Sequence, residues 1–334
     1  MSLLKKRISI ILSTLICCGV IAGCSNTETK ESETKEGKKT IQVKVSIPDG
    51  LPAVAVSKMA AEKINVEDGY DVTYNIEKTP DTLSTTVMKQ DTEIAIVPSN
   101  MAAIAYNKTG NYEIGGTTGL GSFYLVSTEN IKNLDDLKGK EVANTGKGLT
   151  PDIITRFILE ENKINSEDIN FTYASSASEL VPMVSSKKVN AAIVPEPALS
   201  ALMSTNPDVK IIKNLNDEYK NITGSKFGYP QATIIIKSDF AKENKEFVNR
   251  FLDNISESID FANENPDKIG EFAQEIGVST KKEMISKSIE KANLKFISAE
   301  ESIKEYQDYY KILSEYDIKT IGGKLPDEKI YLEK

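Results

Sequence analysis

Histidine and tryptophan are absent from the 334 residues, and cysteine occurs only at Cys17, Cys18 and Cys24. Without a histidine, and without a cysteine after residue 24, the main body offers no Ser-His or Cys-His nucleophile pair and no Cys/His zinc site. It offers no internal disulfide either. Acid and base chemistry by carboxylates, lysine and tyrosine remains possible. We expect no metal site, and we also expect no enzyme and no cofactor.

Basic residues are fewer than acidic ones, 41 against 49, which gives a formal net charge of -8. A chain that is acidic overall and shows no basic patch is not expected to bind nucleic acid. Apolar residues make up 40% of the sequence and charged residues 27%, which is the composition of a globular protein. The length predicts about two domains.

The N-terminus has the features of a bacterial export signal. The basic group Lys5-Lys6-Arg7 precedes an apolar run of 15 residues, Ile8 to Ala22. That run is short for a membrane span and suits a signal peptide. It ends in Ile21-Ala22-Gly23-Cys24, which looks like a lipobox, where small residues precede a cysteine that becomes lipidated. We therefore predict a signal peptide over 1–23 and lipidation of Cys24; an uncleaved anchor is the alternative.

The segment that follows is predicted to be a tether. Residues 25–40 carry no aliphatic or aromatic side chain, so burial cannot offset the entropy lost on ordering them. Loss of Lys5, Lys6 and Arg7 with the signal leaves 38 basic against 49 acidic residues, a net charge of -11. A diacylated Cys24 anchors a protein stably, so we expect 24–40 to tie a soluble acidic body to the extracytoplasmic face of the cell membrane.

The body begins with alternating strand and helix patterns, which predict an α/β fold built on parallel sheet. Apolar residues at helical spacing follow the Pro48-Asp49-Gly50 turn, and a proline stands in the first turn of that helix, as is common. The expected elements are strand 41–47, helix 52–64, strand 72–76, helix 81–89, strand 94–97 and helix 100–107.

Two passages of the sequence resemble each other. Residues 79–100 align without gaps on residues 176–197, at an offset of 97. Each passage reads as helix, short turn, buried strand and proline. Such units are common in α/β folds, so chance similarity is the alternative; otherwise the match indicates two similar lobes that face one another. The matched residues are Leu83 with Leu180, Val87 with Val184, and Ala95-Ile96-Val97-Pro98 with Ala192-Ile193-Val194-Pro195.

Two segments are expected to connect the lobes, the glycine-rich residues 115–126 and residues 227–236. The predicted boundaries are 41–125 plus 235–334 for the first lobe, which includes the C-terminal helices, and 126–234 for the second. After Asp239 the pattern is helical to about Tyr316, and its Tyr and Phe stripes predict core packing rather than a ligand site.

Candidate binding residues lie where strands end and helices begin. In open α/β sheets, ligands bind beyond the carboxyl ends of the strands, where the first N–H groups of helices point into the crevice. Four segments fit this description: Asp49-Gly50-Leu51-Pro52, Ser99-Asn100, Gly146-Lys147-Gly148-Leu149-Thr150, and Glu196-Pro197.

The loop at 146–150 is the most informative of these segments. Its glycines allow close approach of a ligand, and the following helix dipole favours a sulfonate, a carboxylate or another anion. Lys147 and the Thr150 hydroxyl are further donors. The order of residues is not that of a phosphate-binding Walker loop. A structural turn with Thr150 as helix cap is the alternative.

The remaining candidates each have a simpler explanation beside the functional one. Ser99 and Asn100 are suited to cap the next helix, and the turn preference of Asp-Gly accounts for Asp49. Glu196 is placed to accept a hydrogen bond from a ligand amine, with a solvated surface position as the alternative. Thr118 and Ser122 lie on the first connection, where their hydroxyls would reach a bound ligand.

The chain resembles bacterial ABC-transporter solute-binding proteins. The resemblance is carried by the lipobox, the tether and a run at the start of the second lobe, Asn133-Leu134-Asp135-Asp136-Leu137-Lys138-Gly139-Lys140. The Asp49-Gly50-Leu51-Pro52 turn, Val97-Pro98-Ser99-Asn100 and Val194-Pro195-Glu196-Pro197 are most similar to the nitrate/sulfonate/taurine and thiamine-pyrimidine-precursor (NMT1/THI5-like) group. The resemblance covers the whole mature chain and is weak for the ligand.

This resemblance implies a two-lobed periplasmic-binding-protein type II fold with two crossover strands. It also implies a monomer that closes on a small solute and delivers it to an ABC permease. A sulfonate, taurine or nitrate is the expected ligand. A thiamine-pyrimidine precursor stacked on Tyr124 or Tyr229 is an alternative, and so is ligand sensing without import. Related intracellular enzymes of menaquinone and thiamine-pyrimidine synthesis fit less well, because of the lipobox and, for the latter, the missing histidine.

Overall fold

Strands and helices alternate along most of the chain, and the strands form two separate sheets. The computed structural model describes residues 40–333. The predicted signal peptide, Cys24 and nearly all of the tether lie outside the described residues. The predicted α/β fold class is confirmed.

The first sheet has six strands in the order β11-β4-β10-β3-β1-β2. Strand β1 is parallel to both β2 and β3, whereas β10 is antiparallel to β3 and β4, and β11 is antiparallel to β4. The bounds are β1 (Ile41–Pro48), β2 (Tyr70–Glu77), β3 (Ile94–Pro98), β4 (Tyr112–Leu120), β10 (Pro230–Lys237) and β11 (Leu294–Ser298).

The second sheet has five strands in the order β7-β6-β8-β5-β9. Strand β6 is parallel to β7 and β8, and β5 is antiparallel to β8 and β9. The bounds are β5 (Phe123–Ser127), β6 (Glu141–Thr145), β7 (Asn170–Ala174), β8 (Ala191–Pro195) and β9 (Lys210–Asn214).

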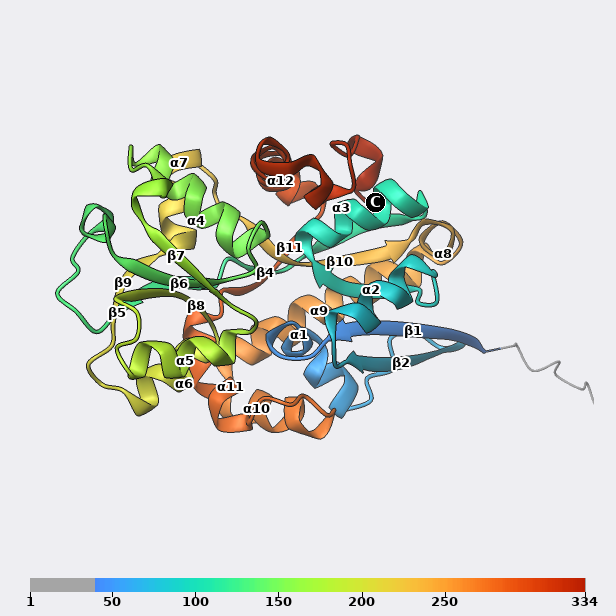
Figure 1. Cartoon of the computed structure of the whole chain (residues 1–334). Helices are drawn as coiled ribbons and strands as arrows, with labels where there is room; N and C mark the ends of the chain where they lie inside the picture. Colours follow the sequence, from blue (N-terminus) through green and yellow to red (C-terminus); the bar gives the residue numbers. More distant parts are fainter. Residues whose placement is uncertain (1–39, 334) are drawn as a thin grey trace, which may run out of the picture. The chain divides into compact units, whose positions relative to one another are not determined.

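Helices cover the faces of both sheets (Figure 1). Those nearest the five-stranded sheet are α4 (Thr150–Glu161), α5 (Ala177–Ser185), α6 (Ala198–Thr205) and α7 (Leu215–Thr223). Those nearest the six-stranded sheet are α1 (Leu51–Ala61), α2 (Pro80–Met88), α3 (Ser99–Thr109), α8 (Ser238–Glu243), α9 (Lys245–Glu264), α10 (Pro266–Glu275), α11 (Lys282–Ser288) and α12 (Ile303–Asp317).

The internal repeat of the sequence is a structural repeat. Adding 97 to the bounds of α2 (80–88) and β3 (94–98) gives the bounds of α5 (177–185) and β8 (191–195). The order β2-β1-β3-β10 in one sheet also matches β7-β6-β8-β5 in the other, with three parallel strands followed by an antiparallel one. The sequence match thus corresponds to equivalent elements of the two sheets.

The chain passes between the sheets twice, once within the expected segment 115–126 and once at residues that overlap the expected segment 227–236 only at 227–229. The first crossing is at Gly121-Ser122, between β4 and β5, and the second is at residues 224–229, between α7 and β10. The prediction of parallel sheet holds for β1 to β3 and for β6 to β8. Each sheet is nevertheless mixed, because the strands next to the crossings run antiparallel to their neighbours.

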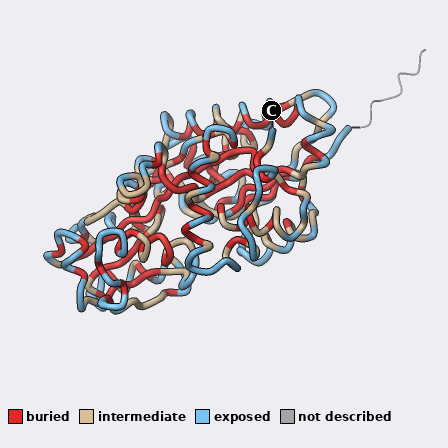
Figure 2. The backbone as a smooth tube through the Cα atoms, turned by 90° about the horizontal axis from the view of Figure 1, so that it is seen from above, coloured by how far each residue is buried: buried red, intermediate tan, exposed pale blue. Residues whose placement is uncertain are grey.

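Buried side chains form three hydrophobic clusters, and Figure 2 shows the buried residues in the interior of the molecule with exposed residues around them. One cluster is shared by the two sheets and includes side chains of α3, α4, α7 and α12. The second packs α1, α9 and α10 on the six-stranded sheet, and the third packs α5 and α6 on the five-stranded sheet. One side of the molecule therefore has a continuous core across both sheets, whereas the other side has two separate cores.

The prediction of unbroken helix after Asp239 is wrong at residues 294–298. These residues form β11, which pairs with β4 through an irregular register. Five residues between helices are too few to show a strand period, and the edge of β4 supplies the missing hydrogen-bonding partners. The core role predicted for the tyrosine and phenylalanine stripes is confirmed, since Phe251, Ile255, Tyr306 and Tyr310 are buried.

Candidate functional site

Four helices begin at the predicted binding segments, and their capping residues have no side-chain capping bond. The caps are Gly50 for α1, Pro98 for α3, Leu149 for α4 and Pro197 for α6. By contrast, the side chain of Thr79 caps α2 and that of Asn214 caps α7. First-turn N–H groups carry partial positive charge and need acceptors. In α1 and α4 the second residue is a proline without an N–H, and the third N–H already donates to the carbonyl oxygen of the capping residue. The first N–H groups of α1 and α4 and the first turn of α3 are therefore the candidate donors to an anionic group.

Side chains of α4, the helix that follows the 146–150 loop, hold this loop in place. Gly148, at φ +71°, donates its N–H to Oδ2 of Asp152 at 2.9 Å. The other carboxylate oxygen of Asp152 accepts from Nε of Arg156 at 2.9 Å and from the hydroxyl of Tyr173 at 2.7 Å. Burial, together with the bond to Asp152, raises the pKa of Tyr173 to about 12. Arg156 thus has a structural role beside this loop, and Asp152 is a loop-holding residue that sequence reasoning missed.

Lys147, Gly148 and Leu149 are the exposed members of this loop. The Nζ atom of Lys147 lies 5.6 Å from the centre of the Tyr173 ring, and Leu149 is 51% exposed. A cation over an aromatic face is attracted to it only weakly at an exposed site. Lys147 is thus exposed, and its contact with an anion stays a prediction.

Neither Ser99 nor Thr150 caps its helix. The Ser99 hydroxyl is buried, 2.7 Å from the hydroxyl of Thr233 in β10, and the Thr150 hydroxyl lies 2.7 Å from that of Tyr309 in α12. The capping alternative is wrong for both residues, because the cap positions are Pro98 and Leu149. A direct bond from either hydroxyl to a ligand stays a prediction.

Asn100 and Asp49 face segments from the C-terminal part of the chain. The side-chain amide of Asn100 donates to the carbonyl oxygen of Thr320 at 3.3 Å. The carboxylate of Asp49 accepts from the backbone N–H of Ser279 at 2.9 Å and from Nζ of Lys78 at 3.1 Å. Burial opposes these bonds, but their sum lowers the pKa of Asp49. Asp49 therefore ties the start of α1 to the segment between α10 and α11.

Residues after Asp49 form the first turn of α1. Gly50, at φ +105°, adopts a conformation that other residues rarely adopt. Leu51 is buried and Pro52 occupies the first turn. The backbone conformation and burial therefore explain why these residue types stand at Gly50-Leu51-Pro52. Ligand contact by these residues stays a prediction.

The predicted crossover residues are buried at the first crossing. Ser122 donates its N–H to Oε1 of Gln231 at 2.8 Å, and its carbonyl oxygen accepts from the N–H of Glu196 at 3.1 Å. The Thr118 hydroxyl points to the carbonyl oxygen of Ala232 at 3.4 Å. The structure thus brings Ser122 and Glu196 together, next to a residue of the second crossover strand.

Glu196 is almost completely buried, with 5% of its surface exposed, so the solvated alternative is wrong. Its two carboxylate oxygens accept from the N–H and from the hydroxyl of Ser200, both at 3.0 Å. Burial raises the pKa of Glu196, and the bonds from Ser200 and the charge of Lys291 only partly offset this effect. Both oxygens already hold the first turn of α6, and acceptance from a ligand amine stays a prediction.

Two aromatic residues considered for stacking are enclosed by protein. Tyr229 has no exposed surface, and its ring lies against Gly121 and Tyr219. Tyr124 is 5% exposed and donates its hydroxyl to the carbonyl oxygen of Lys291 at 2.8 Å. Neither ring presents a free face, which removes the stacking contacts that an aminopyrimidine would need there.

A pocket of about 430 Å³ lies beside the predicted residue Pro197, where α5 and α6 face α11. Its Thr280 follows Ser279, the partner of Asp49. Most of the lining is small and apolar, which suits a hydrocarbon portion of a ligand. The lining residues are Ala177, Ser178, Val181, Pro197, Ala198, Ala201, Thr280 and Met284.

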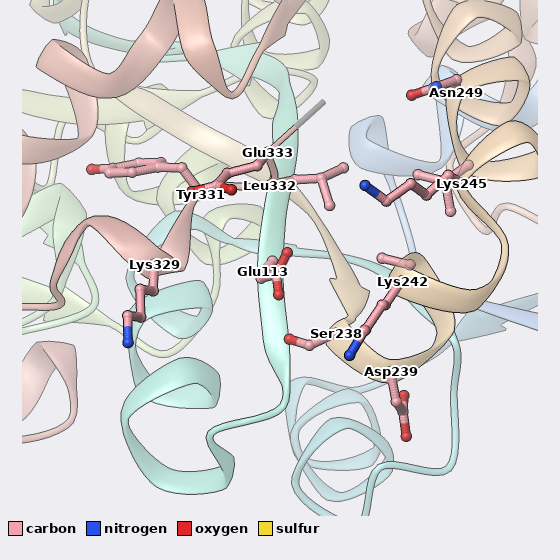
Figure 3. Close-up of a pocket in the computed structure, with 12 residues that line it drawn as sticks. Glu113, Ser238, Asp239, Lys242, Lys245, Asn249, Lys329, Tyr331, Leu332 and Glu333 are labelled. Atoms are coloured by element: carbon pink, nitrogen blue, oxygen red, sulfur yellow. The ribbon is translucent and has the colours of Figure 1, made fainter.

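A second pocket, of about 520 Å³, lies away from these helix starts (Figure 3). Glu113 of β4, Lys242 of α8 and Lys245 of α9 face the C-terminal residues Tyr331 and Leu332 across it. The N–H of Leu332 donates to the carbonyl oxygen of Ile114 at 2.9 Å, so the C-terminal segment is attached to β4. The lining contains none of the predicted site residues.

Within residues 40–333 there is no cluster of three or more acidic, histidine or cysteine side chains placed to hold a metal ion. Among the helices in the same range, none combines the length and the apolar character required to cross a bilayer.

Comparison with known proteins agrees with this geometry. The family model described as NMT1/THI5 like matches residues 66–269, which is more than half of the chain. This protein belongs to the NMT1/THI5-like family. The resemblance inferred from the sequence is thereby confirmed.

Solved structures extend the similarity of this NMT1/THI5-like protein beyond the matched region. A structure of an ABC transporter from Parabacteroides distasonis is 27% identical, with a TM-score of 0.77, over 88% of this chain and 99% of that one. The periplasmic aliphatic sulphonate binding protein SsuA from Escherichia coli is 13% identical, with a TM-score of 0.70, over 88% and 92% of the two chains. The latter likeness shows the fold alone, which is that of periplasmic binding proteins.

The alignments with curated relatives cover a smaller part of this chain. Proteins named as binding proteins in Brucella abortus, Brucella suis and Brucella melitensis are 25% identical over 187 residues. The alignment covers 55% of this chain, which spans about half (54%) of the length of each relative.

Proposed function

We propose that this protein is an extracytoplasmic solute-binding lipoprotein of an ABC importer. It captures a small organic anion of the sulfonate or taurine kind between its two sheets and delivers that anion to a membrane permease. The ligand would be released unchanged, because the protein's part is binding rather than catalysis.

The observation that carries this proposal is the set of uncapped helix starts at the ends of β1, β3 and β6. Three such starts on two matching sheets provide backbone donors from both sides of a ligand. Lys147 adds a positive charge, and the small apolar pocket beside Pro197 favours an organic anion over nitrate. A neighbour with the same fold is an aliphatic sulphonate binding protein, which supports the same ligand class.

Its location follows from the N-terminal sequence. Cleavage before Cys24 and diacylation of Cys24 would leave the body on a polar tether outside the cytoplasm. Replacement of Cys24 by serine is expected to move the protein from the membrane fraction to the soluble fraction. Retention of the Cys24→Ser variant in the membrane fraction would favour the uncleaved anchor.

A thermal-shift screen tests the ligand class. We expect ethanesulfonate and taurine to raise the melting temperature because a ligand that binds the native state stabilises it. Nitrate and an aminopyrimidine serve as the competing classes. Ligand-dependent compaction in small-angle scattering is expected as the sheets close on the bound anion.

Single substitutions test the two charged site residues. Lys147→Ala is expected to weaken ethanesulfonate binding by about fivefold, whereas Lys210→Ala, at an exposed position on β9, leaves it unchanged. Glu196→Gln is expected to weaken taurine and spare ethanesulfonate if Glu196 contacts the amine. Equal effects on the two ligands would assign Glu196 to the support of α6 alone. In the thermal-shift screen, a rise in melting temperature with nitrate alone would contradict the organic ligand class.

A further inference from the structure

One face of α12 carries three tyrosines that share a buried position. Tyr309 and Tyr310 lie three and four residues after Tyr306, so both are neighbours of Tyr306 on one side of the helix. Each has at most 2% of its surface exposed. Figure 1 shows α12 between α3 and α4, and the cluster that joins the two sheets includes all three rings.

Tyr310 contacts the start of α3. Its hydroxyl donates to the carbonyl oxygen of Ser99 at 2.9 Å, and Ser99 is the first residue of that helix. This bond attaches α12 to a predicted binding segment of the six-stranded sheet.

Tyr306 joins the two strands that lead to and from the crossings. Its hydroxyl lies 2.8 Å from that of Thr117 in β4 and 2.7 Å from that of Thr233 in β10. The Thr233 hydroxyl in turn lies 2.7 Å from that of Ser99. Movement of either strand would therefore displace α12 and the start of α3 as well.

Tyr309 contacts the other sheet. Its hydroxyl lies 2.7 Å from that of Thr150, the first residue of α4, which follows β6. Neighbouring residues on one helix thus hold two predicted ligand-binding helix starts, one from each sheet. The ring of Tyr309 is also stacked at 6.5 Å from that of Tyr229, beside the second crossing.

We propose that α12 couples the two halves of the binding site. Tyr309 and Tyr310 act as positioning residues that fix the start of α4 relative to the start of α3. This inference rests on the proposed function. Closure of the sheets would then move the other helix starts toward the ligand while α12 keeps these two at one spacing, and such preorganisation favours affinity.

Binding measurements on the full-length chain test the coupling. Tyr309→Phe and Thr150→Val each remove one hydroxyl of the same pair, and each is expected to raise the Kd for ethanesulfonate about tenfold. The double variant is expected to bind no more weakly than either single variant, because both changes remove one interaction. Tyr112→Phe is the matched control, since the buried Tyr112 hydroxyl donates to the carbonyl oxygen of Thr92 at 2.9 Å within the first sheet. A Kd for Tyr309→Phe equal to that of Tyr112→Phe would overturn the proposal.

Hydrogen exchange without ligand provides a second measurement. Thr150→Val is expected to speed amide exchange within α12, and Tyr309→Phe to speed it in the first turn of α4. Exchange in α12 that is unchanged by Thr150→Val would refute the coupling. If the wild-type chain binds neither ethanesulfonate nor taurine, the proposed ligand class fails, and the exchange result alone decides whether α12 couples the sheets.

Discussion

Gly121 lies directly against the ring of Tyr229. A Cβ atom on Gly121 would stand 2.2 Å from Cζ of Tyr229, and the N–H of Gly121 donates to the carbonyl oxygen of Tyr229 at 3.1 Å. Gly121 belongs to the first crossing between the sheets and Tyr229 ends the second. The two crossings are therefore in contact, and the missing side chain at 121 permits it.

Gly121→Ala is expected to destabilise the protein. The added methyl group would force the crossings apart, and overpacking of this kind costs about 1–3 kcal/mol of the free energy of unfolding. Urea unfolding measures the change. Gly119→Ala is the control, because its Cβ would meet the Cβ of Ala232 at an ordinary 3.5 Å. Equal stability of the two variants would contradict the close contact at Gly121.

Glu196 is expected to make the protein less stable as the pH rises. Burial raises the pKa of Glu196 above its ordinary value of 4.5, so the native state keeps this proton at a pH where the unfolded chain has lost it. The free energy of unfolding then falls as the pH rises from 4.5 through the raised pKa. Glu196→Gln cannot ionise and should flatten this slope in urea unfolding. Glu290→Gln, at a side chain 88% exposed, should leave the slope as it is.

Asp49 is expected to make the protein less stable as the pH falls. Burial would raise the pKa of Asp49, but the bonds from Ser279 and Lys78 outweigh it and lower the pKa below 3.8. The unfolded chain then binds the proton first, so stability is lost as the pH falls from 3.8 through the lowered pKa. Asp49→Asn should reduce this loss, and Asp71→Asn, at an exposed position, should not. Identical acid unfolding of the two variants would contradict the role of Asp49.

Asp152→Asn is expected to loosen the 146–150 loop. The substitution removes the buried partner of the Arg156 guanidinium and leaves only the exposed carboxylate of Glu167 at 3.5 Å. Breaking a largely buried ion pair costs about 3 kcal/mol. Urea unfolding measures this cost, and faster amide exchange at 146–149 would report the freed loop. Asp135→Asn breaks an exposed pair with Lys138 and should cost less than about 1 kcal/mol. Unchanged loop exchange in Asp152→Asn would show that another contact holds the loop.

Local sequence patterns predicted the parts of the fold that depend on neighbouring residues. The offset of 97 between Leu83 and Leu180 reappears in the bounds of α2, α5, β3 and β8. Proline and glycine at 50, 52 and 98 marked helix starts because they restrict or widen backbone conformation in the chain itself. The strand at 294–298 escaped prediction, since it depends on the edge of β4 rather than on its own pattern.

The tertiary structure alone decided what the site side chains contact. Thr150 meets Tyr309 across 159 positions of sequence, and Tyr310 reaches Ser99 across 211. The residues next to a hydroxyl group in sequence do not show whether it bonds to a helix N-terminus, a tyrosine or a ligand. Its hydrogen-bond partner is decided by tertiary packing. The sequence by itself determined the repeat, the helix starts and the family. The helix that joins the two starts was decided by the shared core, because only there are buried hydroxyls forced to find partners on another element.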